Sequence, residues 1–462
     1  MTSSSPRVSP TAETVPFMGI TSAPPRYRQL GLVFALVLAS RIPFVFTTPG
    51  VGKDPDSWRL LLAGQMLVDT GEYRTSRLPG YPVLELFSAA VAGSPVWLFV
   101  LVTAIIGALG VAAFADLLLT LGVRAWWWPA AAMALTPVIY RSDLTFMDYS
   151  WSLAGVMGSM ALLARGRWAW AGAVFGLAVA CRPAAGVLVI GVCAYLLASR
   201  AATRSWVRFG VPAAVTGGAF LALPVIALGP SAIVSAVPES ASPLVVVAKA
   251  TTGVWGGFGA AAVAVALVMV VVRWWRGQCA LDEVQRPWAV AAVAATVAMA
   301  GLFLLLPADP GYLAPIVPMV LLLLALTLTP QWIAVVAALL AVSAFVAPGP
   351  LAKAGPTVTA DRAQRIANTE TARVTTATIA TLPPGTVVVV GYAMPELLAQ
   401  QPREMLADPA LGGPYRQWSV PEYAVIPGGQ ILTHERPTRP TGGPVYRLQN
   451  VPGDEPLLPL GR

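Results

Sequence analysis

Charged residues are scarce in this chain of 462 residues, at 11% of the total, where soluble domains carry about 25%. Hydrophobic residues make up 56% of the sequence, and the mean hydropathy is +0.69. So little charge over so long a chain excludes a soluble enzyme, a disordered chain and a fibrous repeat. It is typical of a polytopic membrane protein.

Histidine and cysteine are almost missing as well. The single histidine, His434, excludes histidine-built metal centres and argues against a His-dependent catalytic triad. The three cysteines lie in or beside apolar segments, so the sequence predicts no disulfide framework. The Walker A, dinucleotide-binding and H-E-x-x-H motifs do not occur. ATP-driven transport, nucleotide-cofactor redox chemistry and zinc proteolysis therefore lack their usual signatures.

What is present is a series of long apolar segments. Residues 1–29 are rich in Ser, Thr and Pro, which predicts a disordered tail. Residues 30–348 contain eleven apolar segments separated by short polar stretches, which predicts an all-α membrane domain of about eleven transmembrane helices. One loop is much longer than the others, from about 48 to 97, and long loops are often functional.

The last part of the chain, 349–462, has no apolar run long enough to span a membrane. A strand is predicted over 386–391, followed by a helix over 394–401, with short strands near 423–426 and 444–448. We therefore expect a small α/β domain after the helical membrane domain.

Lys and Arg collect in alternate loops, as the positive-inside rule requires of cytoplasmic loops. This distribution predicts a plasma-membrane protein with a cytoplasmic N-terminus, and an odd number of spans then places 349–462 outside the cell. The net charge of +8 is thus interpreted as topology and contact with anionic membrane lipids, and no nucleic-acid partner is expected. The preference for Ala, Val and Arg over Lys indicates a high-GC genome such as that of an actinobacterium.

With this topology, most unexplained polar residues lie on the outer side. Asp54 and Asp56 come just after the first apolar segment, before an amphipathic stretch, 57–71, that predicts a helix along the membrane interface. The pair is a candidate for catalysis or for binding a divalent cation, Mg or Mn. The alternative is that Asp56 and Ser57 simply cap that helix.

A second outer loop carries Asp143 and Asp148, each either a helix cap or a substrate-binding carboxylate. Arg182 is the sole charge in an apolar hairpin, 168–198, whose 31 residues are fewer than the about 40 that two spans need. It is therefore expected within the outer leaflet, either binding a phosphate or pyrophosphate or snorkelling to headgroups. Arg77 and Arg141 are weaker candidates for the same role, because they lie nearer bulk water.

A break at Asp309–Tyr312 separates two late apolar segments, and Asp309 is interpreted as part of a plain turn. Tyr312 is either a membrane-interface residue or a substrate ligand. Asp116, near the inner end of the second segment, is interpreted as structural or paired within the helical bundle.

The order of these motifs resembles the GT-C superfamily of membrane glycosyltransferases, which includes protein O-mannosyltransferases, lipid A aminoarabinose transferases and mycobacterial wall mannosyl- and arabinosyltransferases. The resemblance covers roughly 30–330. It rests on six features that follow one another in the sequence. They are an acidic motif (Asp54–Trp58), a helical stretch (Ala63–Gly71), a Pro-rich turn (Leu78–Pro82), an Asp at a helix start (Met147–Tyr149), an Arg-Pro turn (Arg182-Pro183) and a late Pro-rich segment (Pro310–Pro315). The chain departs from the family in having Asp-Pro-Asp where Asp-Glu is usual.

The resemblance implies transfer of a sugar from a polyprenyl-phosphate donor to a glycan, lipid or protein acceptor, with inversion in a single displacement. Asp56 would be the base, since its spacing to Ala63 suits the family pattern, and Asp54 would assist it or bind a cation. Arg182 would stabilise the departing phosphate. The remaining substrate-binding candidates are Asp148, Asp143, Arg141, Arg77 and Tyr312.

Two other functions remain open at this stage. A secondary transporter or lipid-carrier flippase would place polar residues near the midplane, often in two repeated halves. The sequence has no convincing internal repeat, and its polar residues gather on one side, which favours the enzyme. A non-catalytic assembly protein built on a GT-C scaffold is the third alternative.

Overall fold

The computed structural model describes residues 26–230, 241–307, 309–347, 357–399, 423–425, 428–433, 444–448 and 457–460. The predicted disordered tail, 1–29, lies outside these residues except for its last four. Those four belong to the first helix, which begins at Arg26. The single histidine also lies outside the described residues.

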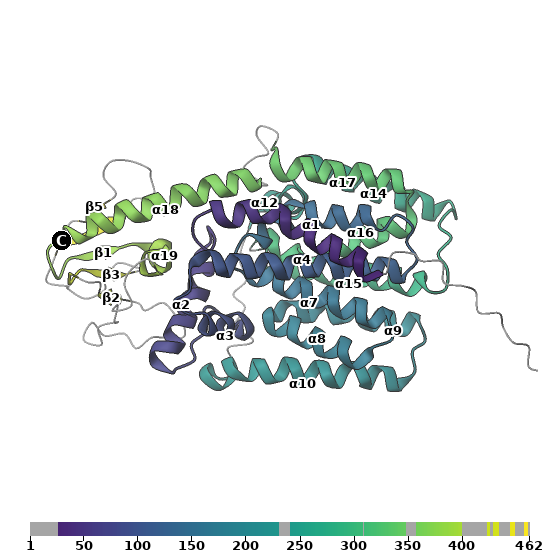
Figure 1. Ribbon diagram of the computed structural model, residues 1–462, viewed down its shortest axis with the longest axis horizontal. Coiled ribbons are helices and arrows are strands. Elements are labelled where there is room, and N and C mark those ends of the chain that lie inside the picture. The colour runs from purple at the N-terminus through teal and green to yellow at the C-terminus, as the bar shows by residue number, and fades with distance from the viewer. Residues whose placement is uncertain are drawn as a thin grey trace, which may run out of the picture.

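Most of the described chain is helical, and the long helices run roughly side by side (Figure 1). The helices of this body are α1 Arg26–Thr47, α4 Val96–Thr120, α5 Trp127–Leu135, α6 Pro137–Asp143, α7 Asp148–Ala164, α8 Trp168–Cys181, η1 Pro183–Leu188, α9 Val189–Ala198, α10 Thr203–Leu228, α12 Pro243–Ala250, α13 Thr252–Trp255, α14 Gly257–Trp275, α15 Gln285–Leu305, η2 Pro310–Leu313, α16 Ile316–Thr327 and α17 Pro330–Phe345.

Within the described residues, six helical segments are long and apolar enough to cross a membrane: α1, α4, α10, α14, α15 and η2 with α16. The shorter α7 packs against both α4 and α8, and α8 packs against α10. A multi-pass membrane protein is therefore confirmed in general, while the number of eleven spans stays a prediction.

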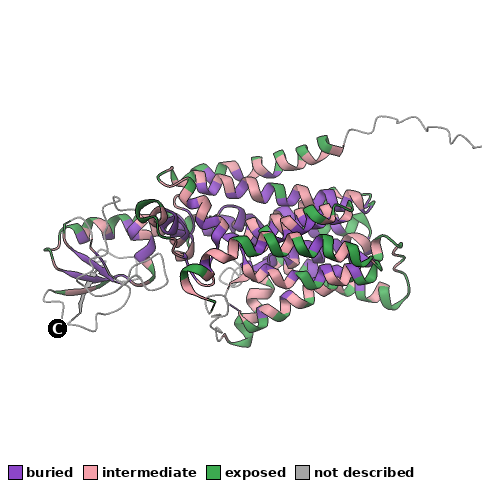
Figure 2. Ribbon diagram, turned by 90° about the horizontal axis from the view of Figure 1, so that it is seen from below, coloured by how far each residue is buried: buried purple, intermediate pink, exposed green. Residues whose placement is uncertain are grey.

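The outward faces of the helices are apolar, as contact with lipid requires. On α10, Val207, Val211 and Val215 recur one turn apart, and all three are exposed. Figure 2 shows exposed residues on the outside of the body and buried ones between the helices. An exposed apolar surface of this kind would be costly in water, so it marks the part of the molecule that lipid covers.

Two stretches form pairs of short helices. The stretch 243–255 forms α12 and α13, and Ser242 and Pro243 provide the helix start, although the stretch is too short to span a membrane. The apolar stretch 127–143 is divided into α5 and α6 at Thr136-Pro137. A residue before proline avoids helical backbone angles, and Thr136 is extended, with ψ of 127°.

Helices from the long loop, α18 and the sheet lie at one end of the helical body (Figure 1). Helices α2 Pro55–Thr70 and α3 Pro82–Ala90 come from the long loop, and α18 Val358–Ala380 leads to a five-stranded sheet in the order β2-β3-β1-β4-β5. The strands are β1 Val387–Val389, β2 Tyr423–Val425, β3 Ile431–Thr433, β4 Val445–Leu448 and β5 Leu457–Leu460. The central β1 is parallel to β3 and β4, and both edge strands are antiparallel.

The sheet has a small core of its own. Val388 on β1 pairs with Leu432 on β3, and both are buried against Ile379 of α18. Helix α19, Met394–Ala399, contributes Leu397 to the same cluster. The strand and helix expected over 386–391 and 394–401 correspond to β1 and α19.

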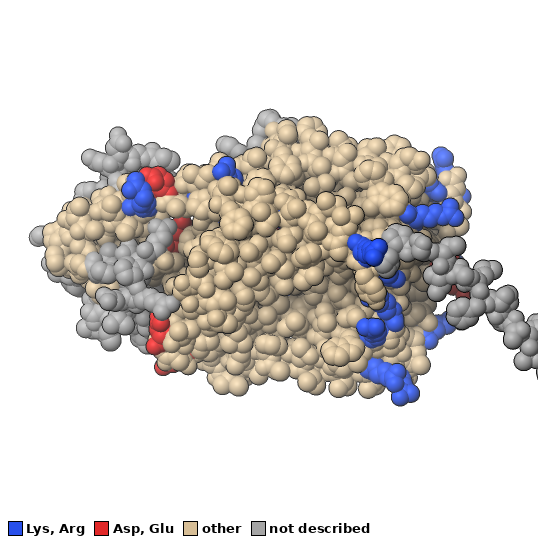
Figure 3. All heavy atoms as spheres, in the orientation of Figure 1, with Lys and Arg blue, Asp and Glu red and all other residues tan. Residues whose placement is uncertain are grey.

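Charge is distributed unevenly along the long axis. Lys and Arg crowd the end from which the N-terminal segment leaves, while Asp and Glu lie near the junction with the sheet (Figure 3). At the basic end, Asp116 of α4 pairs with Arg26 at 2.7 Å and also with Arg165. The interpretation of Asp116 as a paired structural residue is therefore confirmed.

One buried arginine fastens α18 to the helical body. Arg365 donates hydrogen bonds to the carbonyl oxygens of Leu144 at 2.7 Å, Pro49 at 3.1 Å and Gly50. These carbonyls belong to the loop after α1 and to the end of α6. Arg365 thereby holds the segment that leads into Asp54.

Replacing this arginine should loosen that segment. Arg365→Met keeps most of the stem but removes the donors, and one hydrogen bond from a charged group contributes about 1.5–3 kcal/mol. We expect hydrogen exchange of the amides in 50–54 to accelerate about tenfold or more, measured by mass spectrometry on protein in nanodiscs. The control is Arg373→Met on the same helix, where the arginine is exposed and pairs with Glu370. Equal exchange in both variants would contradict the role of Arg365.

Candidate active site

Asp54 and Asp56 stand at the start of α2, at the acidic end of the body. Asp54 is the N-cap residue, and its Oδ1 accepts a hydrogen bond of 2.9 Å from the backbone N–H of Asp56. The cap expected at Asp56-Ser57 is therefore formed two residues earlier, because Pro55 occupies the first helical position. Both carboxylates lie at the positive end of the helix dipole.

Asp56 is engaged by two arginines. Its Oδ1 accepts from Arg59 at 3.0 Å, and its Oδ2 lies 3.3 Å from Nε of Arg77. Arg59 is on the same helix, whereas Arg77 comes from the loop between α2 and α3. The loop that carries Arg77 is held by buried Glu85 on α3, which accepts from the backbone N–H and the hydroxyl of Ser76, both at 2.7 Å.

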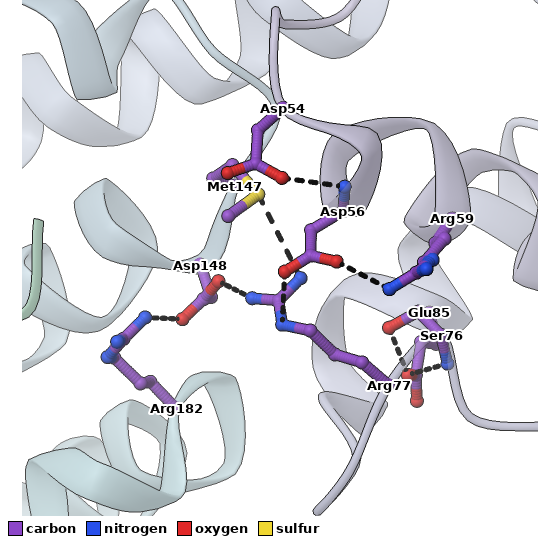
Figure 4. A network of polar contacts seen from close by, with 9 residues as sticks. All are labelled: Asp54, Asp56, Arg59, Ser76, Arg77, Glu85, Met147, Asp148 and Arg182. Carbon is purple, nitrogen blue, oxygen red and sulfur yellow. Dashed lines mark hydrogen bonds and ion pairs between the residues drawn. The ribbon is translucent and has the colours of Figure 1, made fainter. Parts of the chain in front are cut away.

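Arg77 links Asp56 to a second carboxylate, Asp148. One nitrogen of Arg77 pairs with Oδ1 of Asp148, and Arg182 pairs with Oδ2 of the same carboxylate (Figure 4). Asp148 is completely buried at the start of α7, and Arg182 follows the end of α8. Residues from three distant parts of the sequence thus form one chain of charges.

This polar network, defined as Arg59, Asp56, Arg77, Asp148 and Arg182, contains three guanidinium groups and two carboxylates. With Asp54, whose carboxylate lies beside Asp56 and Arg77, the charges of the two signs are equal in number. The deepest part of the network, where Asp148 lies between Arg77 and Arg182, is almost fully buried, whereas the Asp56 side chain is 27% exposed.

Arg182 is the member of the network with the most unused donors. The side chain is 3% exposed, and its Nε and Nη2 have no hydrogen-bond partner among the described residues. Its guanidinium lies over two aromatic rings, 4.3 Å from the ring centre of Tyr149 and 4.0 Å from that of Tyr312. The rings hold the group in place and leave its N–H donors to an anionic ligand.

Asp54 lines a small cavity of about 60 Å³ beside this network. Arg141, Tyr149 and Asp309 also line it, so the cavity joins residues from four separate segments. Arg141 donates to the carbonyl of Gly253 at 3.3 Å, and its buried Nε has no partner among the described residues. Burial and the neighbouring Asp56 carboxylate raise the pKa of Asp54 above its ordinary value.

Two of the aspartates noted in the sequence, Asp143 and Asp309, make contacts that belong to the local fold. Asp143 is completely buried, where it pairs with Arg41 of α1 at 3.0 Å and accepts from the hydroxyl of Ser150 at 2.7 Å. Neither Asp143 nor Arg41 lines the cavity. Asp309 accepts from the backbone N–H of Gly311 at 2.6 Å, as expected for a turn residue, and its side chain also reaches the cavity.

The carboxylate pair was also a candidate for a divalent cation. Both oxygens of Asp56 face arginine, and one oxygen of Asp54 accepts a backbone N–H. No group of three or more His, Cys, Asp or Glu side chains suited to a metal occurs in the described part of the chain. These contacts leave one carboxylate oxygen, Oδ2 of Asp54, and the binding of Mg or Mn stays a prediction.

Three residues of the site were not singled out from the sequence. Tyr149 and Tyr81 stack on Arg182 and Arg77, the latter with 3.9 Å between guanidinium and ring centre, and Glu85 holds the Arg77 loop. The only sequence signal is that Tyr81 and Tyr149 each lie within four residues of a candidate Arg or Asp. Tyrosines at a membrane interface give the same signal.

The helical body and the network at its acidic end define a polytopic membrane protein with a polar site on one side. The sequence matches no protein-family model and none of the curated proteins. The structure is similar to the crystal structure of ArnT from Cupriavidus metallidurans bound to undecaprenyl phosphate, with a TM-score of 0.54 and 15% sequence identity. The match covers 79% of this chain and 82% of that chain. The chain therefore shares the overall fold of ArnT, in agreement with the resemblance noted from the sequence.

Proposed function

We propose that this protein is a membrane glycosyltransferase that moves a sugar from a polyprenyl-phosphate donor to an acceptor on the outer face of the membrane. The observation that carries the proposal is Arg182, a buried guanidinium whose Nε and Nη2 have no hydrogen-bond partner among the described residues. A lipid-linked phosphate at that depth would accept hydrogen bonds from these two nitrogens. The structure of the similar protein ArnT contains a lipid of this chemistry, undecaprenyl phosphate.

The orientation follows from the charge distribution. The basic end of the body suits the cytoplasmic side, which leaves the network, α18 and the sheet outside (Figure 3). Nucleotide sugars are not available on that side, so a lipid-linked donor is the appropriate source of the sugar.

The contacts favour Asp54 as the general base, although the sequence pattern pointed to Asp56. Asp56 gives both oxygens to arginines, whereas Asp54 lines the cavity and has a raised pKa. A carboxylate with a pKa nearer the working pH is the better proton acceptor. Asp56 then positions Arg77, which in turn holds Asp148.

In the proposed reaction, Asp54 takes the proton of an acceptor hydroxyl. The hydroxyl oxygen forms a bond to the anomeric carbon while the bond from that carbon to the phosphate oxygen breaks. The polyprenyl phosphate leaves with the bonding electron pair, and Arg182 stabilises its negative charge. One displacement inverts the anomeric centre.

Binding of the donor tests the role of Arg182. Arg182→Ala should weaken binding of undecaprenyl phosphate to the protein in nanodiscs about tenfold or more, since hydrogen bonds to charged groups contribute about 1.5–3 kcal/mol. Arg182→Lys keeps the charge but not the planar fork, so its affinity should lie between the other two. The control is Arg165→Ala, which removes an arginine paired with a carboxylate at the opposite end. Unchanged affinity in a folded Arg182→Ala protein would mean that this arginine only compensates Asp148.

A transporter or flippase would bind the same lipid without chemistry. The wild-type protein should release polyprenyl phosphate from a polyprenyl-phosphate sugar when membrane acceptors are present. Movement of the intact lipid across the bilayer with no cleavage would favour the transporter and overturn the enzyme.

A further inference from the structure

A second, larger cavity lies between the C-terminal part of the chain and the start of α2. It has a volume of about 410 Å³, within the range of about 300–1,000 Å³ usual for small-molecule sites. Its walls come from α18, from α19 with the turn before it, and from the segment Lys53–Trp58. We call it the α18 groove.

The groove continues toward the site described above. Lys53 lines both the α18 groove and the 60 Å³ cavity, and the next residue is Asp54. The charge of Lys53 is already balanced by Asp361, 3.4 Å away. A molecule in the groove therefore has one end beside the proposed base.

The α18 wall of the groove carries uncharged hydrogen-bonding groups among apolar residues. Gln364 and Asn368 present side-chain amides one turn apart, linked by a 2.8 Å hydrogen bond from Nε2 of Gln364 to Oδ1 of Asn368. Thr371 continues the same face of α18 with a hydroxyl. Amides and hydroxyls both donate and accept, which suits a ligand that itself carries many hydroxyls.

An aromatic side chain also contributes to the lining of the groove. Tyr392 lines the groove and is 72% exposed, unusual for so large a side chain on a folded domain. An exposed aromatic ring with a polar tip offers an apolar face to the C–H side of a sugar ring. A polyprenyl chain would instead require walls without amides and hydroxyls.

We propose that the α18 groove binds the acceptor of the reaction and that this acceptor is an uncharged glycan. The proposal rests on the glycosyltransferase function proposed above. A glycan lying along Gln364, Asn368 and Thr371 would direct its terminal sugar past Lys53 toward Asp54. The partly buried carboxyl of Glu396, whose pKa is raised by burial to about 7, adds a group that can donate or accept near neutral pH.

A matched pair of substitutions on α18 tests the groove. Ala367 and Ala377 are both exposed alanines of this helix, but only Ala367 lines the groove. Ala367→Trp should fill the groove, while Ala377→Trp adds the same bulk elsewhere. The probes are neutral hexasaccharides of mannose, arabinose, glucose and galactose, and the measurement is saturation-transfer NMR with full-length protein in nanodiscs.

We expect at least one hexasaccharide to bind the wild type and Ala377→Trp with dissociation constants within twofold of each other. Its affinity for Ala367→Trp should fall at least tenfold. Binding of none of the hexasaccharides to the wild type, or equal binding to both variants, would overturn the glycan groove.

Undecaprenyl phosphate binding, measured on the same samples, separates this proposal from the proposed function. Lipid binding that persists in Ala367→Trp while hexasaccharide binding is lost supports the groove as a separate acceptor site. If the wild type binds a hexasaccharide but not undecaprenyl phosphate, the donor site fails and the groove stands.

Discussion

Asp54→Asn is expected to lower the rate of sugar transfer by about 10² or more, because the proposed general base is lost. The protein should still fold, since Asn also caps helices well and its side-chain oxygen can accept the same N–H of Asp56. The measurement is transfer of labelled sugar from the polyprenyl-phosphate donor to endogenous acceptors in membranes, at equal protein level. Donor affinity should change little, because Asp54 is not in contact with Arg182.

The pH dependence provides an independent check. The base acts in its deprotonated form, so activity should fall as the pH drops through the pKa of Asp54. Burial and the charge of Asp56 raise that pKa, so the acidic limb should lie above the value of about 3.9 for an ordinary aspartate. If Asp56→Asn abolishes transfer while Asp54→Asn retains it, Asp56 is the base, as the sequence pattern predicted. If both variants keep full activity, the catalytic interpretation of this pair is wrong.

Asp148→Asn is expected to have the largest effect on stability. Asp148 is completely buried between two guanidinium groups, and removing one partner of a buried ion pair costs about 3–5 kcal/mol. In the variant, Arg77 and Arg182 face each other without a carboxylate between them. The loss should appear as a lower midpoint of thermal unfolding in detergent.

Asp116→Asn is the matched control, since Asp116 also bridges two arginines. Its partners, Arg26 and Arg165, are 34% and 28% exposed, so water screens their charges and the loss should be about 1 kcal/mol or less. Equal destabilisation by the two substitutions would contradict the view that Asp148 holds two buried guanidinium groups together. Undecaprenyl phosphate should stabilise the Asp148→Asn protein at least as much as the wild type, because its phosphate supplies a negative charge beside Arg77 and Arg182.

Much of the site could be named from the sequence because its residues mark local events along the chain. Asp54 precedes a proline at a helix start, Asp148 begins α7, and Arg182 ends an apolar helix that would otherwise carry no charge. Each is conspicuous because polar side chains are rare in an apolar sequence. Their partners were not conspicuous: Tyr149 looks like any interfacial tyrosine, and Arg365 looks like any charge on a polar helix.

The sequence by itself determined the class of the protein, since a chain with 11% charge and repeated apolar segments can bury its backbone polar groups only as membrane helices. It also determined which polar residues require an explanation. Only the tertiary structure decided how they pair: Arg77 and Arg182 on Asp148, Arg41 on Asp143, and Arg365 on the loop before Asp54. The physical reason is that an ion pair or a hydrogen bond depends on a few ångströms between groups that lie up to 316 positions apart in the sequence. Hydropathy places such residues at one end of a helix but not beside one another.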